Sequence, residues 1–399
     1  MVAGDLVLQD FEQAPTPISQ YIYAQKFRSL IKDRTAGFVG RDFIFTAVDG
    51  HVQDPQFPSG YIVISGEPGI GKTAIMAELI RRHGYVHHFN IAAQNIRSPR
   101  DFLKNICAQL IVRYKLDVNY LPPHSVKDSG YLSELLGRIA AESANHPIVV
   151  LVDALDEAED IDLPPQANRL FLPPSLPDGV HFIVTTREKH DYRLYVDWQK
   201  DIYLQEDSPD NLKDIRQYIR SFVRENQSQM ISQIDDWGIE EKDFVETMTE
   251  KSEGNFMYVV HVLRDICIGR LGQRNIDDVH KLPKGLKGYY QRHWRWMQDQ
   301  DLTRFKKYFQ PVVCLLAAAR EPVTVKTIVA WTKLESADVQ EVIRTWREFL
   351  NEDESPSGEP LYRIYHTSFR DFLQAEVGLK GYHSQIAQAA LQKIPGLAG

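Results

Sequence analysis

The residues with the clearest chemistry form a glycine-rich run from Gly66 to Thr73, GEPGIGKT, directly after the apolar segment YIVIS. The run satisfies the pattern GxxxxGK[ST], and the helical segment AIMAELIRRH follows it. Glycines let the backbone approach a ligand closely, so successive N–H groups and a helix N-terminus can surround phosphate oxygens. A chance glycine loop is the alternative, but the order strand, loop, helix favours a nucleotide site.

Two side chains of this loop have specific expected roles. Lys72 is predicted to bridge the β- and γ-phosphates of ATP, and the Thr73 hydroxyl to ligate Mg²⁺. The other residues expected to surround the phosphates are Gly66, Pro68, Gly69, Ile70, Gly71 and Ala74. The predicted cofactors are therefore ATP or ADP with Mg²⁺.

A second apolar run, IVVLV, is followed by the carboxylates of Asp153, Asp156 and Glu157. They are expected at the carboxyl edge of a sheet, where ligands bind in such folds. Asp153 is predicted to hold Mg²⁺ through water. Asp156 and Glu157 lie close enough to orient or polarise an attacking water, which predicts ATP hydrolysis. An acidic helix start, favoured by the helix dipole, accounts for one carboxylate but poorly for all three.

Two further side chains have a functional and a structural interpretation. The run VHFIVTT ends at Arg187, whose guanidinium could report on a γ-phosphate or could simply be solvated. His366 lies in IYHTSFRDFL, where strand-like residues run into a short amphipathic helix. A histidine at such a junction is by default a surface or packed residue.

Composition excludes some classes of protein. The 399 residues carry a net charge of −8, which gives no overall positive field to attract nucleic acid or acidic membranes. Cys107, Cys267 and Cys314 are far apart and form no CxxC pair, which suits buried thiols in a reducing compartment. No signal pattern or apolar run of roughly 18 residues is present, so we expect a cytoplasmic protein with no membrane partner.

The pattern of elements predicts an α/β P-loop domain followed by helical modules. Between residues 38 and 206, the runs YIVIS, VHHFNIA, PIVVLV and VHFIVTT alternate with helix-like segments, which predicts a parallel sheet with helices on both faces. At DSPDNLKDIRQYIRSF the pattern becomes purely helical, with Ser208 as a cap and Pro209 in the first turn.

The domains predicted on this basis have the following limits. Residues 1–37 form an N-terminal arm, 38–206 the nucleotide-binding domain and 207–299 a helical domain. Residues 300–375 contain three predicted helices and two strand-like pieces separated by NEDESPSGEP, which indicates a winged helix. Residues 376–399 begin a further helical segment.

The motifs FVGRD, GEPGIGKT, VLVDALDE and IVTTR, in this order, resemble the nucleotide-binding domain of STAND ATPases, the signal-transduction class that includes NACHT and NB-ARC proteins. The later segments SEGNFMY, LPKGL and HTSFRDFL are similar to motifs of bacterial and fungal members. The resemblance covers about residues 38–373. The P-loop alone is generic, whereas the ordered set is more specific.

The resemblance implies further site residues. Phe38, Val39 and Arg41 are expected beside the adenine and ribose. The segment around Gly254 to Met257, which includes Phe256, is expected to close the other side of the base. Family members hold ADP in a closed form, in which the winged-helix histidine, here His366, contacts the β-phosphate. His366 is therefore expected to act as a latch.

The sequence departs from the family pattern in three places. Ala154 stands where many relatives have glycine, and no GLPL-type proline follows Gly254. The chain ends after the expected winged helix, and no effector domain precedes Phe38. We therefore expect either an excised core or a protein whose sensor is a separate, unknown protein.

The resulting hypothesis is a nucleotide-controlled switch that holds ADP, exchanges it for ATP, forms homo-oligomers and hydrolyses ATP slowly. One alternative is an AAA+-like ATPase whose winged helix binds DNA. Its wing should be basic, but the expected wing carries Glu352, Asp353, Glu354 and Glu359, which disfavours DNA as a partner. Another alternative is a scaffold that binds nucleotide without turnover.

Overall fold

The computed structural model describes residues 18–91, 94–143, 146–160, 163–187, 192–269, 278–355 and 358–391. The chain divides into two compact units. The first comprises the chain up to Ser228 apart from the short segment 92–95, and the second comprises that segment and the chain from Gln229. Among the described residues, no helix has the length and apolar character needed to span a bilayer.

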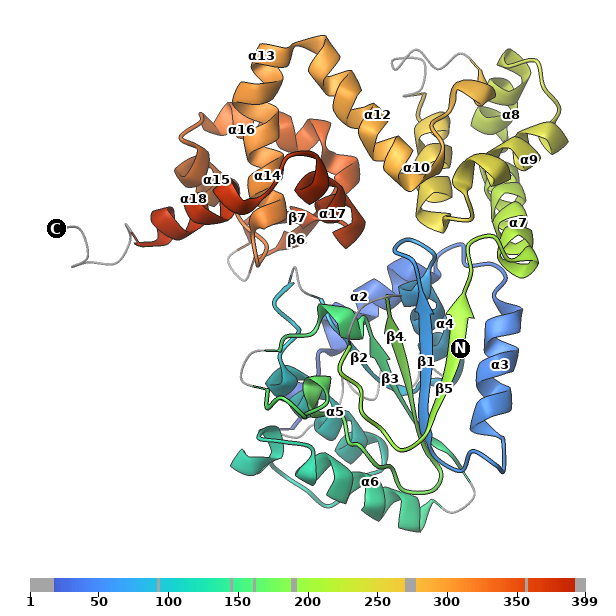
Figure 1. Ribbon diagram of the computed structural model, residues 1–399, viewed down its shortest axis with the longest axis vertical. Helices are drawn as coiled ribbons and strands as arrows, with labels where there is room; N and C mark the ends of the chain where they lie inside the picture. Colours follow the sequence, from blue (N-terminus) through green and yellow to red (C-terminus); the bar gives the residue numbers. More distant parts are fainter. Residues whose placement is uncertain are drawn as a thin grey trace. The chain divides into compact units, whose positions relative to one another are not determined.

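The first unit contains a five-stranded parallel sheet with the order β2-β3-β4-β1-β5 (Figure 1). Its strands are β1 Gly60–Gly66, β2 Val86–Phe89, β3 Ile148–Asp153, β4 Val180–Thr186 and β5 Gln199–Leu204. The first four strands are the predicted apolar runs, so the prediction of a parallel sheet is confirmed. The sequence pattern did not identify β5, because this edge strand is largely polar and only its last residue, Leu204, is buried.

Helices cover both faces of this sheet (Figure 1). On one face lie α2 Ala24–Thr35, α3 Asp42–Val52 and α4 Lys72–His83. On the other face lie α5 Pro99–Arg113 and α6 Gly130–Glu142. Alternate residues of β1 divide between the two cores, since Ile62 and Ile64 join the first and Tyr61 and Val63 the second. Burial on both faces explains why the central strands are continuous apolar runs.

Helix α7, Pro209–Glu225, begins as the sequence predicts, with Ser208 as its N-cap. The helix also buries two polar residues, Asn211 and Asp214, which bond to Arg41 in the first unit. The division between the units therefore falls after α7, whereas the sequence pattern placed a boundary before it, at residue 206.

The second unit is helical apart from one hairpin. Its earlier helices are α8 Gln227–Asp236, α9 Glu241–Ser252, α10 Phe256–Cys267 and α12 Gly285–Gln300. Its later elements are α14 Gln310–Ala318, α15 Val325–Thr332, α16 Ser336–Thr345, β6 Leu350–Glu354, β7 Pro360–Ile364, α17 Thr367–Glu376 and α18 Lys380–Leu391. Aromatic rings of the turn that follows α16 pack against α12 and α17, with the Trp294 and Trp346 ring centroids 5.8 Å apart and those of Phe349 and Phe369 4.6 Å apart.

The hairpin differs in extent from the sequence-based expectation. The acidic residues from Glu352 to Glu354 were predicted to lie in the loop, but they belong to β6, which pairs antiparallel with β7. Backbone hydrogen bonds decide the extent of such a strand, so its polar side chains do not shorten it. The connection is confined to residues 355–359, of which 356 and 357 lie outside the described residues.

Candidate functional site

The glycine-rich loop lies between β1 and α4, which is the order that its motif requires. Gly69 has a φ of 89° and Gly71 a φ of 105°, a region that favours glycine. Gly71 is also the N-cap of α4, so the turn directs the first N–H groups of this helix toward the loop. The predicted phosphate-binding residues therefore share one loop and one helix start.

Lys72 lies at the start of α4, with its ammonium turned back over the loop. Its Nζ donates to the carbonyl oxygens of Gly66, at 2.6 Å, and Glu67, at 3.1 Å. Burial lowers the pKa of Lys72, while the nearby Asp156 and Asp153 act in the opposite direction. The cation is therefore in a partly desolvated setting, where its interaction with a phosphate is stronger than in water.

The Asp153 carboxylate lies at the end of β3 and is only 3% exposed. Its Oδ2 accepts from the Thr73 hydroxyl at 2.9 Å, and its Oδ1 from the Thr185 hydroxyl at 2.5 Å. Burial raises the pKa of Asp153, and these two hydrogen bonds oppose that effect. A carboxylate beside a hydroxyl is the hard oxygen donor set that Mg²⁺ prefers. The predicted metal residues Thr73 and Asp153 therefore lie together and fit the ion.

Asp156 and Arg187 form an ion pair next to this carboxylate. The Nε of Arg187 lies 2.9 Å from Oδ2 of Asp156, and the side chains are 17% and 5% exposed. Arg187 is therefore held by a site residue, in contrast to the solvated arginine of the alternative interpretation. Glu157 follows in the same 3-10 turn, which begins after Ala154 in the left-handed conformation, with a φ of 53°.

Arg41 is buried between the phosphate loop and α7. Its guanidinium donates to the Ile70 carbonyl oxygen at 2.5 Å and to Asn211 Oδ1 at 2.8 Å, while its backbone N–H donates to Asp214 Oδ2 at 2.9 Å. A Cβ on the preceding Gly40 would lie 2.3 Å from Oδ1 of Asp214, which explains the glycine. Arg41 therefore links the phosphate loop to α7, and its contact with the ribose stays a prediction.

The remaining predicted nucleotide contacts lie at element boundaries. Phe38 and Val39 are half-buried before α3, and the Phe38 ring packs 6.0 Å from that of Phe45. In the second unit, Phe256 is the first residue of α10 and His366 is the N-cap of α17. The expected contacts of these residues with a nucleotide in the first unit stay predictions.

Sequence reasoning missed two residues that fix Asp153. Thr185 on β4 bonds to its carboxylate, and Asn90, which follows β2, donates through Nδ2 to its carbonyl oxygen at 2.8 Å. Both lie at the carboxyl ends of buried strands, like Asp153 itself. A polar residue at that position of a predicted strand is the signal that could have identified them.

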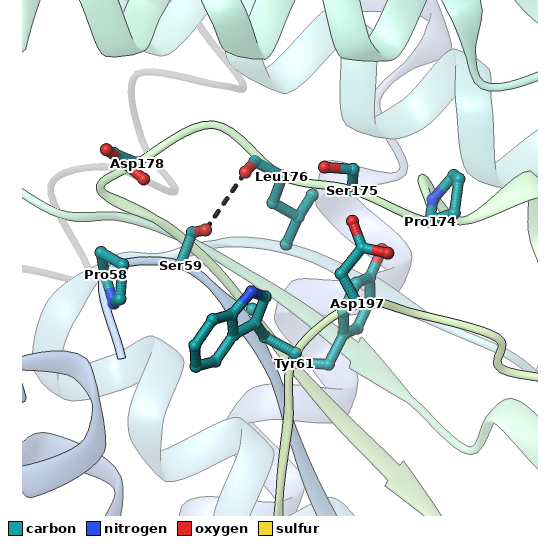
Figure 2. A pocket seen from close by; sticks show the side chains of 10 residues that line it. Pro58, Ser59, Tyr61, Pro174, Ser175, Leu176, Asp178 and Asp197 are labelled. Atoms are coloured by element: carbon teal, nitrogen blue, oxygen red, sulfur yellow. Dashed lines mark hydrogen bonds between the residues drawn. The ribbon is translucent and has the colours of Figure 1, made fainter. Parts of the chain in front are cut away.

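A separate cavity of about 290 Å³ lies at the amino end of β1 (Figure 2). The segment from Pro58 to Tyr61 lines it together with residues including Asp178 and Asp197. The Ser59 hydroxyl donates to the Leu176 carbonyl oxygen at its wall, at 3.1 Å. The cavity contains none of the predicted site residues. It lies at the amino ends of the strands, whereas Asp153 lies at the carboxyl end of β3.

Comparison with known proteins agrees with this geometry. Residues 37–168 match the family model of an AAA ATPase domain. A human protein, NACHT domain- and WD repeat-containing protein 1, is 32% identical over 138 residues, which are 31% of this chain and 8% of that protein. The chain therefore spans a small part of that relative.

Two solved structures are similar at low identity. A signal transduction ATPase with numerous domains (STAND) and a tetratricopeptide repeat sensor, from Pyrococcus horikoshii, is 14% identical, with a TM-score of 0.41 over 90% of this chain and 46% of its own. A RuvB variant from Thermotoga maritima is 12% identical, with a TM-score of 0.31 over 85% of this chain and 97% of its own. At these TM-scores the two structures carry no argument. The family model and the human relative agree with the ordered motifs and with the parallel sheet that carries them, and residues 37–168 are similar to AAA ATPase domains.

Proposed function

We propose that the first unit binds ATP or ADP with Mg²⁺ and hydrolyses ATP slowly, as the nucleotide-controlled part of a switch. The observation that carries this proposal is the carboxylate of Asp153, buried between the hydroxyls of Thr73 and Thr185 and next to the Asp156–Arg187 ion pair. A buried carboxylate is costly unless it is hydrogen-bonded and paired or binds a cation. This arrangement at the end of a phosphate loop favours a metal-nucleotide site.

Each side chain of the site has a proposed role. Lys72 binds phosphate oxygens, and Thr73 with Asp153 would hold the metal, Asp153 through water. When bound, Mg²⁺ would supply positive charge that neutralises the phosphates. Asp156 and Glu157 follow closely enough to orient or polarise the attacking water, and Asp156 also pairs with Arg187. Arg187 then lies where it can respond to a γ-phosphate.

The proposal also includes a conformational switch between an ADP-bound and an ATP-bound state. ADP stabilises a closed state, and exchange for ATP releases the winged helix and exposes a surface for homo-oligomerisation. A separate sensor or effector protein would set the timing of that exchange. The supporting feature in the second unit is the sequence of α14, α15, α16 and the β6–β7 hairpin, which are the elements of a winged helix.

The geometry of His366 suits the proposed latch. Its Nδ1 accepts a hydrogen bond from the Ser368 backbone N–H at 3.2 Å. Because a neutral imidazole that accepts at Nδ1 carries its proton on Nε2, this cap selects the tautomer in which Nε2 is a donor. A donor at Nε2 is what a contact with an anionic phosphate oxygen requires.

The test combines nucleotide content with turnover. We expect ADP to co-purify with the wild-type chain and phosphate to be released slowly from ATP. Glu157→Gln should retain binding but lower phosphate release by roughly 10²-fold, the loss expected for a general base. Lys72→Ala should lose both, while Lys127→Ala, an exposed lysine of the same unit, should match the wild type. Equal phosphate release from wild type and Glu157→Gln would reject the hydrolytic role of Glu157, and no release above background from either would favour the scaffold.

The alternative of a DNA-binding winged helix finds no support in the charges of the hairpin. Glu352 on β6 pairs with Arg347 at 3.3 Å, which neutralises one of the cations available to a phosphate backbone. Salt-sensitive binding of a DNA duplex at moderate ionic strength would revive that alternative.

A further inference from the structure

Asp153 is held by one hydroxyl from the glycine-rich loop and by one from a neighbouring strand of the sheet. Thr73 is part of the glycine-rich loop, whereas Thr185 lies on β4, in the middle of the sheet. We propose that Thr185 is a positioning residue, whose hydroxyl orients the carboxylate of Asp153 for Mg²⁺. This inference rests on the proposed function of the first unit as a metal-nucleotide site.

The direction of each hydrogen bond around Thr185 follows from its partners. The Ala154 backbone N–H, which can only donate, lies 2.8 Å from Oγ1 of Thr185. The hydroxyl therefore accepts there and donates its own proton to Oδ1 of Asp153, at 2.5 Å. One side chain thus fixes both the carboxylate and the backbone turn that follows it. With Thr73 bound to Oδ2, the rotation of the carboxyl group is fixed from both sides.

The adjacent Thr186 provides a matched comparison. Both threonines are fully buried. Consecutive residues of a strand face opposite sides of the sheet, so Thr186 points away from Asp153. Within the part of the chain that the structure describes, its hydroxyl has no hydrogen-bond partner. Replacement by valine therefore removes a buried hydroxyl at both positions. Only at Thr185 does this hydroxyl contact Asp153.

The experiment measures nucleotide affinity with and without Mg²⁺, using a fluorescent ADP analogue on the full chain. Thr185→Val should weaken binding in Mg²⁺ by roughly 10–100-fold, the effect typical of a lost partner of a metal ligand, with little change in EDTA. Thr185→Ser, which keeps the hydroxyl, should restore the Mg²⁺ dependence. Thr186→Val should bind as the wild type does in both conditions.

The outcomes separate this inference from the proposed function. A wild type whose ADP affinity increases in Mg²⁺, with an equal increase in Thr185→Val, overturns the inference alone. A wild type that binds no nucleotide overturns the proposed function and the inference with it. If Thr185→Val does not fold, Thr185→Cys carries the same test, since a thiol is a weaker donor and should give a loss that serine does not.

Discussion

At the residue scale, Arg41 is a buried cation that links the phosphate loop to α7. It is 2% exposed, and burial lowers the pKa of its guanidinium to about 10, although the nearby Asp214 opposes this. The charge is balanced by hydrogen bonds to Ile70 and Asn211 and by the carboxylate of Asp214. Removing one partner of such a group leaves the other buried without compensation.

We therefore expect Arg41→Met to lower the free energy of unfolding of the first unit by roughly 3 kcal/mol, because the Asp214 carboxylate loses its cation. Adding Asp214→Asn should recover part of this loss, since the amide carries no charge. Arg100→Met, on the exposed side of α5, should change stability by less than about 0.5 kcal/mol. Urea unfolding of the three variants is the measurement, and an Arg41→Met curve equal to the control would contradict the role of the pair.

At the scale of elements, side chains of α5 form hydrogen bonds with the backbone of the edge strand β2. The His87 backbone N–H donates to Oε1 of Gln109 at 3.0 Å, and its carbonyl oxygen accepts from Nε2 of the same amide at 2.7 Å. Asn105 donates to that carbonyl oxygen at 2.9 Å. The amides occupy the hydrogen-bonding groups that an edge strand otherwise exposes to another chain.

The two histidines of β2 predict an acid sensitivity of the first unit. Burial lowers the pKa of His87 to about 4 and that of His88 to about 3. Because both values lie below the unfolded value of about 6.5, the folded state binds fewer protons, and stability falls as the pH drops below 6.5. Between pH 7 and pH 5 the loss should be roughly 4 kcal/mol, measured by urea unfolding at each pH.

One substitution should reduce this pH dependence by about half. The His88 ring packs edge-on against Phe27 and Phe102, so His88→Phe preserves the packing and removes one titrating group. His124→Phe, at an exposed position of the same unit, is the control and should keep the wild-type pH dependence. If the free energy of unfolding of His88→Phe fell with pH as steeply as that of the wild type, other groups would cause the acid sensitivity.

At the scale of the whole molecule, the energetics of the proposed switch exceed what one contact supplies. Moving a two-state equilibrium from 1:99 to 99:1 requires about 5.5 kcal/mol of differential binding. In the proposed latch, a charge-assisted hydrogen bond from His366 would contribute about 1.5–3 kcal/mol. The proposed switch would therefore need the γ-phosphate, Arg187 and an activating partner to provide the remainder.

Two substitutions of His366 separate its cap from the proposed latch. His366→Leu removes the ring and the cap of α17, whereas His366→Asn keeps a side chain that caps helices well. Both should weaken ADP binding by roughly tenfold or more and favour assembly, because neither reaches a phosphate as imidazole does. ADP content after purification and light scattering provide the measurements. If His366→Asn retained as much ADP as the wild type, the only remaining role of His366 would be that of N-cap of α17.

The sequence by itself determined the elements whose signals are local. The glycine spacing from Gly66 to Gly71, the apolar runs of β1, β3 and β4, and the serine cap of α7 depend on residues close together in the chain, so a pattern predicts them. The carboxylates of Asp153, Asp156 and Glu157 were found for the same reason, since they directly follow an apolar strand.

Only the tertiary structure decided which distant side chains meet. Thr185 reaches Asp153 because β4 lies beside β3, and Arg41 meets Asp214, 173 positions later, because α7 packs next to the phosphate loop. The polar edge strand β5 and the acidic strand β6 are likewise defined by backbone pairing with another strand. Such contacts depend on partners that no local pattern encodes, and they orient the groups on which the proposed chemistry depends.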